Sequence, residues 1–251
     1  MGLLKTEAIV LRSNIIGETD KIAILLTKDY GKIQAVAKGA RRSKSRLINS
    51  TRPFSIGNYV LFEGKNYYYI DQWELINLYQ NFEKDLMKLS YAAYFTNVLD
   101  KILEYNEKNP SIFNLLKSTL NNLDNLYIDE NILYSSYNLK LLLVLGYFPE
   151  MNNCTVCGIQ KKLRYFSSLS GGLVCDECLK SVKDAIYVND NTIKAIKYLT
   201  KVKFKNLENI QISKNTLYEL DKIIADYIRI HLDIDLKYKH FLDNIKKLKE
   251  V

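Results

Sequence analysis

The chain has 251 residues, of which 47% are hydrophobic and 25% charged, and its formal net charge is +8. This length fits one large domain or two to three small ones, and the composition is that of a folded protein. No apolar run approaches the roughly 18 residues of a membrane-spanning helix, and the first 20 residues lack the pattern of a signal peptide. We therefore expect a cytoplasmic protein, in which thiols stay reduced.

The positive charge is concentrated at the two ends of the chain. Residues 1–80 carry 12 basic and 7 acidic side chains, residues 81–150 carry 6 and 9, and residues 181–251 carry 14 and 10. Such a distribution is expected if one or two surfaces bind a polyanion. For the C-terminal segment, a lysine-rich surface that favours solubility explains the excess equally well.

The first 80 residues predict a small β-barrel. Short apolar or alternating runs, separated by turns at residues such as Gly31 and Gly64, indicate strands at 8–11, 21–27, 32–38, 58–62, 67–70 and 72–76. Five or six short strands at this spacing are typical of a closed or partly open barrel. A parallel α/β sheet would need crossover helices, for which this stretch has no room.

From about Phe82 the hydrophobic period becomes helical. We expect helices at 82–103, 110–123, 133–145, 191–200, 216–231 and 238–249. Asn109 is placed as an N-cap with Pro110 at the first helical position, and Gly146 ends the nearly all-apolar helix before it. The fold class expected is α+β and multidomain, with a barrel domain at 1–80 and a helical domain at 81–251 that is interrupted at about 150–180.

The four cysteines form two pairs, Cys154-x-x-Cys157 and Cys175-x-x-Cys178, separated by 17 residues. This spacing predicts a zinc ribbon with one Zn²⁺, which is structural because four protein ligands leave no open position. Two disulfides would be unusual in a reducing cytosol, and a redox dithiol would need only one pair. The segments 164–166 and 171–174 between the pairs predict a β-hairpin.

A basic run without acidic residues extends from Tyr30 to Phe62. Residues 38–46 follow a predicted strand, contain Gly39 and two serines, and are expected to form a flexible loop that can follow a phosphate backbone. Aromatic residues of the barrel could stack on unpaired bases, although such residues more often belong to a core: Tyr59, Phe62, Tyr67, Tyr68, Tyr69 and Trp73. The predicted nucleic-acid-binding residues are Lys32, Lys38, Arg41, Arg42, Lys44, Arg46 and Arg52.

The sequence offers no positive case for catalysis. Its two histidines, His231 and His240, lie near no recognisable nucleophile motif. The chain contains neither the phosphate-binding loop G-x-x-x-x-G-K-[ST] nor the dinucleotide motif G-x-G-x-x-G. We therefore expect a protein that is not an enzyme.

Several segments together resemble the RecO family of bacterial DNA repair proteins, the recombination mediators. They are 7–12, 17–21, 25–27 and 30–32, with 35–46 followed by Pro53-Phe54 as the most specific stretch. Beyond residue 76 the similarity is one of layout, with Leu145-Gly146-Tyr147-Phe148-Pro149 leading into the first cysteine pair. The resemblance implies an N-terminal OB-fold barrel and a helical domain into which a zinc ribbon is inserted.

The resemblance also implies a non-enzymatic role. Members of the family bind single- and double-stranded DNA, anneal complementary strands, and act with RecR to load RecA on DNA coated by single-strand binding protein, in the RecF pathway. They also bind the acidic C-terminal tail of that protein, and RecF is a further implied partner. The implied location is the cytoplasm, in association with the nucleoid.

By match to the family, Lys38, Arg41, Arg42, Lys44 and Arg46 are the implied DNA-binding residues. Candidates for binding the acidic tail on the C-terminal helices are Arg229, Lys237 and Lys239. Some relatives lack the cysteines, so zinc is not expected to be the shared functional feature. Two alternatives remain open: an adaptor that acts mainly through protein contacts, and an RNA-binding protein with an OB barrel and a zinc ribbon.

Overall fold

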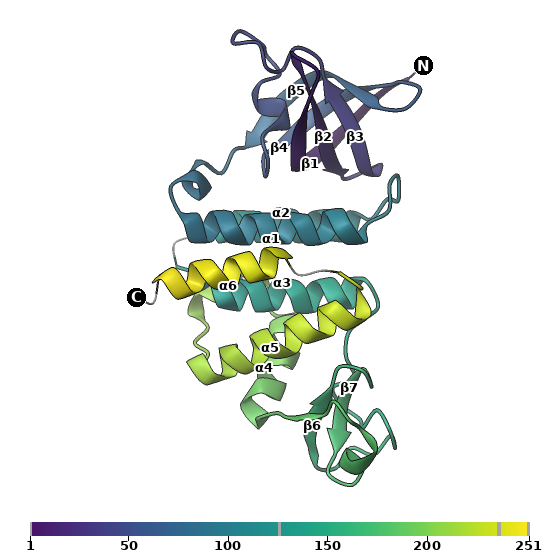
Figure 1. Ribbon diagram of the computed structural model, residues 1–251, viewed down its shortest axis with the longest axis vertical. Coiled ribbons are helices and arrows are strands. Elements are labelled where there is room, and N and C mark those ends of the chain that lie inside the picture. Colours follow the sequence, from purple (N-terminus) through teal and green to yellow (C-terminus); the bar gives the residue numbers. More distant parts are fainter. Residues whose placement is uncertain (1, 125–126, 235–236, 250–251) are drawn as a thin grey trace. The chain divides into compact units, whose positions relative to one another are not determined.

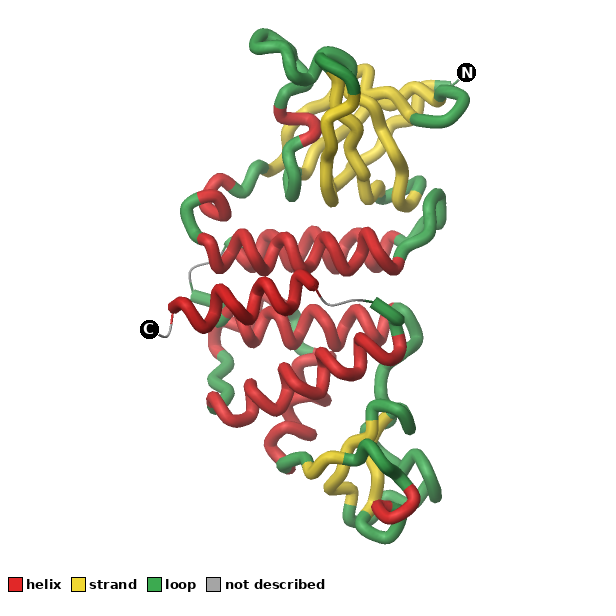
Figure 2. Tube along the Cα trace, in the orientation of Figure 1, coloured by secondary structure: helices red, strands yellow, loops and turns green. Residues whose placement is uncertain are grey.

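The computed structural model describes residues 2–124, 127–234 and 237–249. The chain forms two compact units, Met1–Asp124 with Tyr238–Val251, and Asn125–Lys237. Strands and helices occur together, as the α+β prediction requires (Figure 2). The division into domains at residue 80 stays a prediction.

The first unit contains a closed five-stranded barrel. Its strands are β1 (Leu3–Ile16), β2 (Asp20–Thr27), β3 (Gly31–Ala37), β4 (Ile56–Glu63) and β5 (Tyr68–Asn77), in the order β1-β2-β3-β5-β4 (Figure 1). All neighbours are antiparallel except β3 and β5, which pair in parallel. Residues 68–77 form one strand where two runs, 67–70 and 72–76, were predicted, because a register shift that leaves Asp71 unpaired opposite β4 interrupts the alternation.

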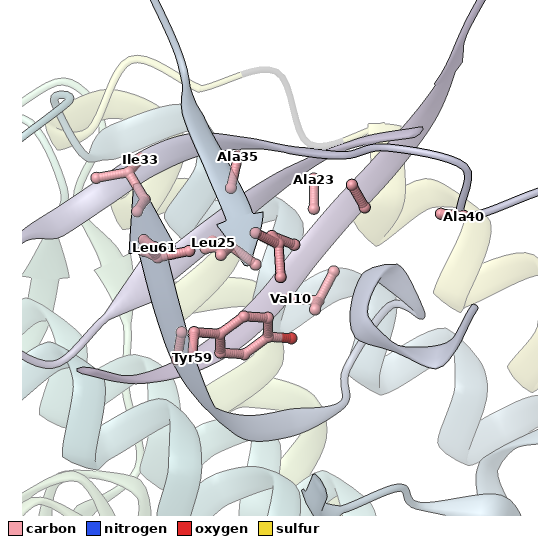
Figure 3. Packing of buried hydrophobic residues seen from close by; sticks show 11 residues of the cluster. Val10, Ala23, Leu25, Ile33, Ala35, Ala40, Tyr59 and Leu61 are labelled. Carbon is pink, nitrogen blue, oxygen red and sulfur yellow. The ribbon is translucent and has the colours of Figure 1, made fainter. Parts of the chain in front are cut away.

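Small and large side chains alternate inside the barrel. Ala23 and Ala35 lie near Leu25, Leu61 and Tyr59 in a fully buried cluster (Figure 3). The Tyr59 hydroxyl donates a hydrogen bond of 2.7 Å to the Ser50 carbonyl, which satisfies its one polar atom. Residues 8–11 of β1 are buried on both faces because helix α1 packs on the outside of this strand, which explains their continuous apolar run.

Three helices complete the first unit: α1 (Leu86–Ile102), α2 (Pro110–Leu123) and α6 (Lys237–Lys249), the last of which joins it from residue 238. Asn109 caps α2, as predicted, by accepting a hydrogen bond of 3.1 Å from the Ile112 N–H. Charged side chains fasten the barrel to the helices. Arg12 and Lys32 bind Asp100 of α1, and Glu7 forms an ion pair with Lys117 of α2.

The second unit contains α3 (Glu130–Val144), α4 (Asp190–Lys201), α5 (Lys214–His231) and a three-stranded sheet of β6 (Leu163–Ser167), β7 (Gly172–Cys175) and β8 (Ile186–Tyr187). Helix α3 packs against α4 and α5. Gly146 ends α3 as predicted, with φ of +79°, and the Tyr147 N–H donates a hydrogen bond of 2.8 Å to the Leu142 carbonyl. Within the described ranges, no helix has the length and apolar character needed to cross a membrane.

Short 3₁₀ helices connect these elements. They are η1 (Asn49–Thr51) between β3 and β4, η2 (Gln80–Glu83) before α1, η3 (Leu179–Ser181) after the second cysteine pair, and η4 (Phe204–Asn209) between α4 and α5. Of these, η1 matters most for the site, because it ends the loop that carries the basic run.

Candidate nucleic-acid interface and metal centre

Residues 38–46, called the basic loop below, lie outside the strands and form successive turns between β3 and η1. The Arg42 N–H donates a hydrogen bond to the Gly39 carbonyl, and the Ser45 N–H donates one to the Arg42 carbonyl, each of 3.0 Å. Gly39 has φ of +67°, a conformation that glycine adopts without the cost of a Cβ atom. The loop backbone is therefore folded by its own turns.

Asp20 and the turn before it hold the start of the basic loop. The Asp20 carboxylate accepts hydrogen bonds of 2.8 Å from the Gly39 N–H and from the Thr19 hydroxyl. These two bonds, led by the one from Gly39, lower the pKa of Asp20. Arg41 donates from its backbone to the Thr19 carbonyl at 2.9 Å and from its guanidinium to the Glu18 carbonyl at 2.7 Å. The β1–β2 turn thus serves as the base of the loop.

Trp73 of β5 holds the other end of the basic loop. Its indole N–H donates a hydrogen bond of 2.9 Å to the Arg46 carbonyl. The sequence pattern alone predicted no such anchoring role for Asp20, Thr19 or Trp73. Asp20 lies within a segment that carries the family resemblance, which was the signal available for it.

Five of the seven predicted basic residues are exposed on this loop: Lys38, Arg41, Arg42, Lys44 and Arg46. The Lys38 ammonium lies 5.0 Å from the centre of the Tyr69 ring. Arg41 binds carbonyl oxygens and not carboxylates, so its charge is not neutralised by these bonds. The loop therefore presents five positive charges within nine residues.

The other two predicted residues are placed differently. Arg52 is half-buried at the end of η1. Lys32 is 5% exposed, and its ammonium donates a hydrogen bond of 2.6 Å to the Asp100 carbonyl and lies 4.5 Å from the centre of the Tyr105 ring. Lys32 is thus held in the interior of the first unit and adds no exposed charge to the basic loop.

The aromatic residues named as stacking candidates also differ in exposure. Tyr59 is 1% exposed and belongs to the barrel core. Trp73 is half-buried and bonded to the loop, whereas Tyr67 is exposed. Phe62, Tyr68 and Tyr69 are half-buried.

The lysine and arginine residues considered for the acidic tail are not equivalent. Lys239 is 4% exposed and forms an ion pair with Asp243 one helical turn away. Arg229 is exposed and binds Asp226 at 2.5 Å. Lys237 is exposed at the start of α6.

The four cysteines converge on one point. Their Sγ atoms all lie within 4.8 Å of one another, and Cys157 Sγ is 3.8 Å from Cys175 Sγ. Ligands at about 2.3 Å from a tetrahedral zinc ion are about 3.8 Å apart, whereas a disulfide bond is about 2.05 Å long. The donor set and the spacing therefore fit one metal ion, and the predicted hairpin is formed by β6 and β7.

The protonation of the thiols also favours a cation among them. Burial opposes the ionisation of Cys154, but backbone N–H groups, led by that of Cys157, outweigh it and lower the pKa of this thiol to about 6. Contacts with the Cys157 and Cys175 side chains raise the pKa of Cys178 to about 12. Four neighbouring thiolates thus need a positive ion to coexist.

The sheet that carries β7 is tied to its own unit at two places. The Leu173 N–H donates a hydrogen bond of 2.9 Å to the Glu150 carbonyl, and Glu150 and Gly172 form an isolated parallel β-bridge. His231 is the last residue of α5, and its Nε2 atom lies 2.7 Å from the Ser168 carbonyl oxygen. The centres of the His231 and Tyr227 rings are 4.1 Å apart. The sheet is therefore fastened to the segment that precedes it and to helix α5.

A closed OB-like barrel with a basic loop, followed by helices and a four-cysteine cluster, defines the class of protein. Residues 1–79 match the family described as "Recombination protein O N terminal", and residues 83–240 match "Recombination protein O C terminal". Relatives named "DNA repair protein RecO" include one from Thermoanaerobacter sp. (strain X514), 54% identical over 99% of this chain and all of the relative. Another, from Listeria monocytogenes serovar 1/2a, is 32% identical over 97% of this chain and 95% of the relative. The chain belongs to the RecO family.

Proposed function

We propose that this chain is a mediator of DNA repair and homologous recombination that binds single- and double-stranded DNA and anneals complementary strands. With RecR it promotes the loading of RecA on DNA coated by single-strand binding protein, whose C-terminal tail it binds, and RecF is a further partner. The role is non-enzymatic and is exercised in the cytoplasm, at the nucleoid. The observation that carries the proposal is the anchored basic loop with its five exposed positive charges.

Annealing needs two polyanions to be neutralised while their bases stay free to pair. Contacts to phosphate supply affinity without reading sequence, and each neutralised phosphate adds the free energy of counterion release. Exposed arginine and lysine side chains on a short loop meet both requirements. The anchors at Asp20 and Trp73 support this by fixing the loop before DNA arrives, which reduces the entropy lost on binding.

Within this proposal the four cysteines hold one structural Zn²⁺. Four thiolates would fill its coordination shell, so the ion would cross-link the two ends of the 154–178 segment and supply no chemistry to DNA. The domain organisation that accompanies the proposal is a barrel domain at 1–80 and a helical domain at 81–251 with the ribbon inserted at about 150–180.

The test of DNA binding uses the triple variant Arg41→Glu, Arg42→Glu, Arg46→Glu. The control variant carries Lys5→Glu, Lys28→Glu and Lys84→Glu, which reverse three charges that are exposed elsewhere in the first unit. Each phosphate contact contributes about 0.7 to the salt dependence of single-strand binding, so three lost contacts lower the slope of log K against log salt by about 2. The control is expected to keep a slope close to that of the wild type.

Two outcomes would change the proposal. If the triple variant bound DNA with the affinity and slope of the control, the protein would act as an adaptor through protein contacts. If matched RNA oligomers bound much more tightly than DNA oligomers across the salt series, the RNA-binding alternative would replace it.

A further inference from the structure

Helix α4 and the start of η4 carry a row of lysines that the proposed function does not use. Between residues 191 and 207 the chain has five lysines and no acidic residue. A spacing of three or four residues places Lys194, Lys197 and Lys201 on one side of α4. We call the following set the α4 stripe: Lys194, Lys197, Tyr198, Lys201, Lys203 and Lys205.

The stripe lies on the outer side of a firmly held helix. Thr192, Ile196 and Leu199 are buried on the other side of α4. Lys140 of α3 donates a hydrogen bond of 2.7 Å to the Thr200 carbonyl in the last turn, and Glu219 of α5 accepts one of 2.6 Å from the Thr192 hydroxyl in the first. Both ends of the helix are therefore fixed within the second unit.

The lysines of the stripe keep their charge available. Four are exposed and Lys197 is half-buried. Among the residues that the structure describes, none of the five forms an ion pair with an acidic side chain. A solubility surface usually mixes both signs of charge, so a row of one sign indicates a polyanionic partner.

Tyr198 indicates which polyanion. Its side chain is 54% exposed, four residues after Lys194 and three before Lys201. An exposed ring among cations is the pattern by which proteins bind single-stranded nucleic acids, since unpaired bases stack on the ring while lysines contact the phosphates. In a duplex the bases are already stacked and offer no face to Tyr198.

We propose that the α4 stripe is a second site for single-stranded nucleic acid, separate from the basic loop and located in the other compact unit. The lysines contact phosphates, and Tyr198 stacks on an unpaired base. The inference deepens the proposed function and rests on it in one respect: a protein that anneals has use for a second strand-binding surface.

The experiment uses the full chain and a labelled deoxythymidine oligomer of about 15 nucleotides, which cannot pair with itself. Lys194→Glu, Lys197→Glu and Lys201→Glu are introduced together, both in the wild type and in the triple basic-loop variant. The control carries the same charge change at Lys183, Lys214 and Lys222, which are exposed in the same unit. Thermal unfolding checks that each variant is folded.

We expect the wild type to bind two oligomers per chain and the basic-loop variant to keep one. The α4 substitutions should remove this residual binding, and the control should not. Tyr198→Ala should weaken residual binding about tenfold, whereas Tyr198→Phe, which keeps the ring, should not.

The second site would be overturned if the basic-loop variant bound no oligomer at all. It would also be overturned if the α4 substitutions left the binding of that variant as strong as the control substitutions do. Equal binding of a duplex of the same length, or equal competition by polyglutamate, would overturn its assignment to single strands. Failure of the proposed function is a separate result, since there the basic-loop variant itself would bind like the wild type.

Discussion

Asp100 of α1 offers the sharpest test of how the barrel is held to its helices. Its carboxylate lies 2.6 Å from Arg12 Nε and 3.8 Å from Lys32 Nζ, and the side chains of Asp100 and Lys32 are only 8% and 6% exposed. Asp100→Ala leaves the Lys32 ammonium buried without its carboxylate. The ammonium keeps its contacts with the backbone carbonyl of residue 100 and with the Tyr105 ring. Breaking a buried pair costs about 3–5 kcal/mol of stability. An acid near a helix C-terminus is unfavourable, so its removal restores a few tenths of a kcal/mol. We expect a loss of about 3 kcal/mol in the free energy of unfolding.

A second substitution separates the pair from the rest of the interface. Lys32→Met keeps most of the side-chain volume and removes the buried charge, so Asp100→Ala with Lys32→Met should be more stable than the sum of the single losses by about 2 kcal/mol. Arg12 is 46% exposed. Arg12→Ala should therefore cost less than about 1 kcal/mol.

The assay is urea unfolding of the full chain followed by the fluorescence of Trp73. This is the one tryptophan of the sequence, and it lies in β5 of the barrel. Losses that added within about 0.5 kcal/mol would show that the two side chains are not coupled and would refute the reasoning. Lys32→Met should also leave the salt dependence of DNA binding unchanged, because the ammonium is buried.

Three further predictions concern the zinc site, a glycine and an acid. Cys154→Ser or Cys175→Ser, or removal of zinc by a chelator, should lower the melting temperature strongly while the DNA affinity of the molecules that remain folded changes little. Unchanged stability in a metal-free preparation would contradict this. Gly31→Ala should lower the melting temperature much more than Gly17→Ala. Both glycines have positive φ, but a Cβ at Gly31 would collide with the Glu107 carbonyl oxygen, whereas Gly17 faces open space; equal losses in the two melting curves would contradict the prediction. The lowered pKa of Asp20 means that its bond to Gly39 stabilises the fold above the ordinary value of 3.8 and is lost as the pH falls through the lowered pKa. Asp20→Asn should lose this dependence, and parallel acid-unfolding curves for the two proteins would argue against it.

Much of the fold follows from local patterns in the sequence. Alternation and turns predicted the strands, and Asn109, Pro110 and Gly146 marked helix ends that the structure confirms. The cysteine spacing predicted a cluster, and the four thiols do lie together. Each of these features is decided within about 25 residues of chain.

What the sequence could not give depends on distant partners. Lys32 alternates outward from β3 like a solvent-facing residue, but the acid that binds it comes from α1, 68 residues later. Asp20 and Trp73 meet the basic loop across strands, which periodicity does not reveal. The lysines of α4 share a predicted helix with Tyr198, but the structure was needed to show that the opposite side of this helix is the buried one.

The central claim is that the basic loop neutralises DNA strands so that they can pair. The most direct measurement is the rate at which complementary strands anneal, with the wild type, the Arg41→Glu, Arg42→Glu, Arg46→Glu variant and the Lys5, Lys28, Lys84 control, each with and without RecR. We predict rapid annealing by the wild type and the control, and a rate near that of protein-free strands for the basic-loop variant. Annealing by the basic-loop variant at the rate of the control would contradict the account.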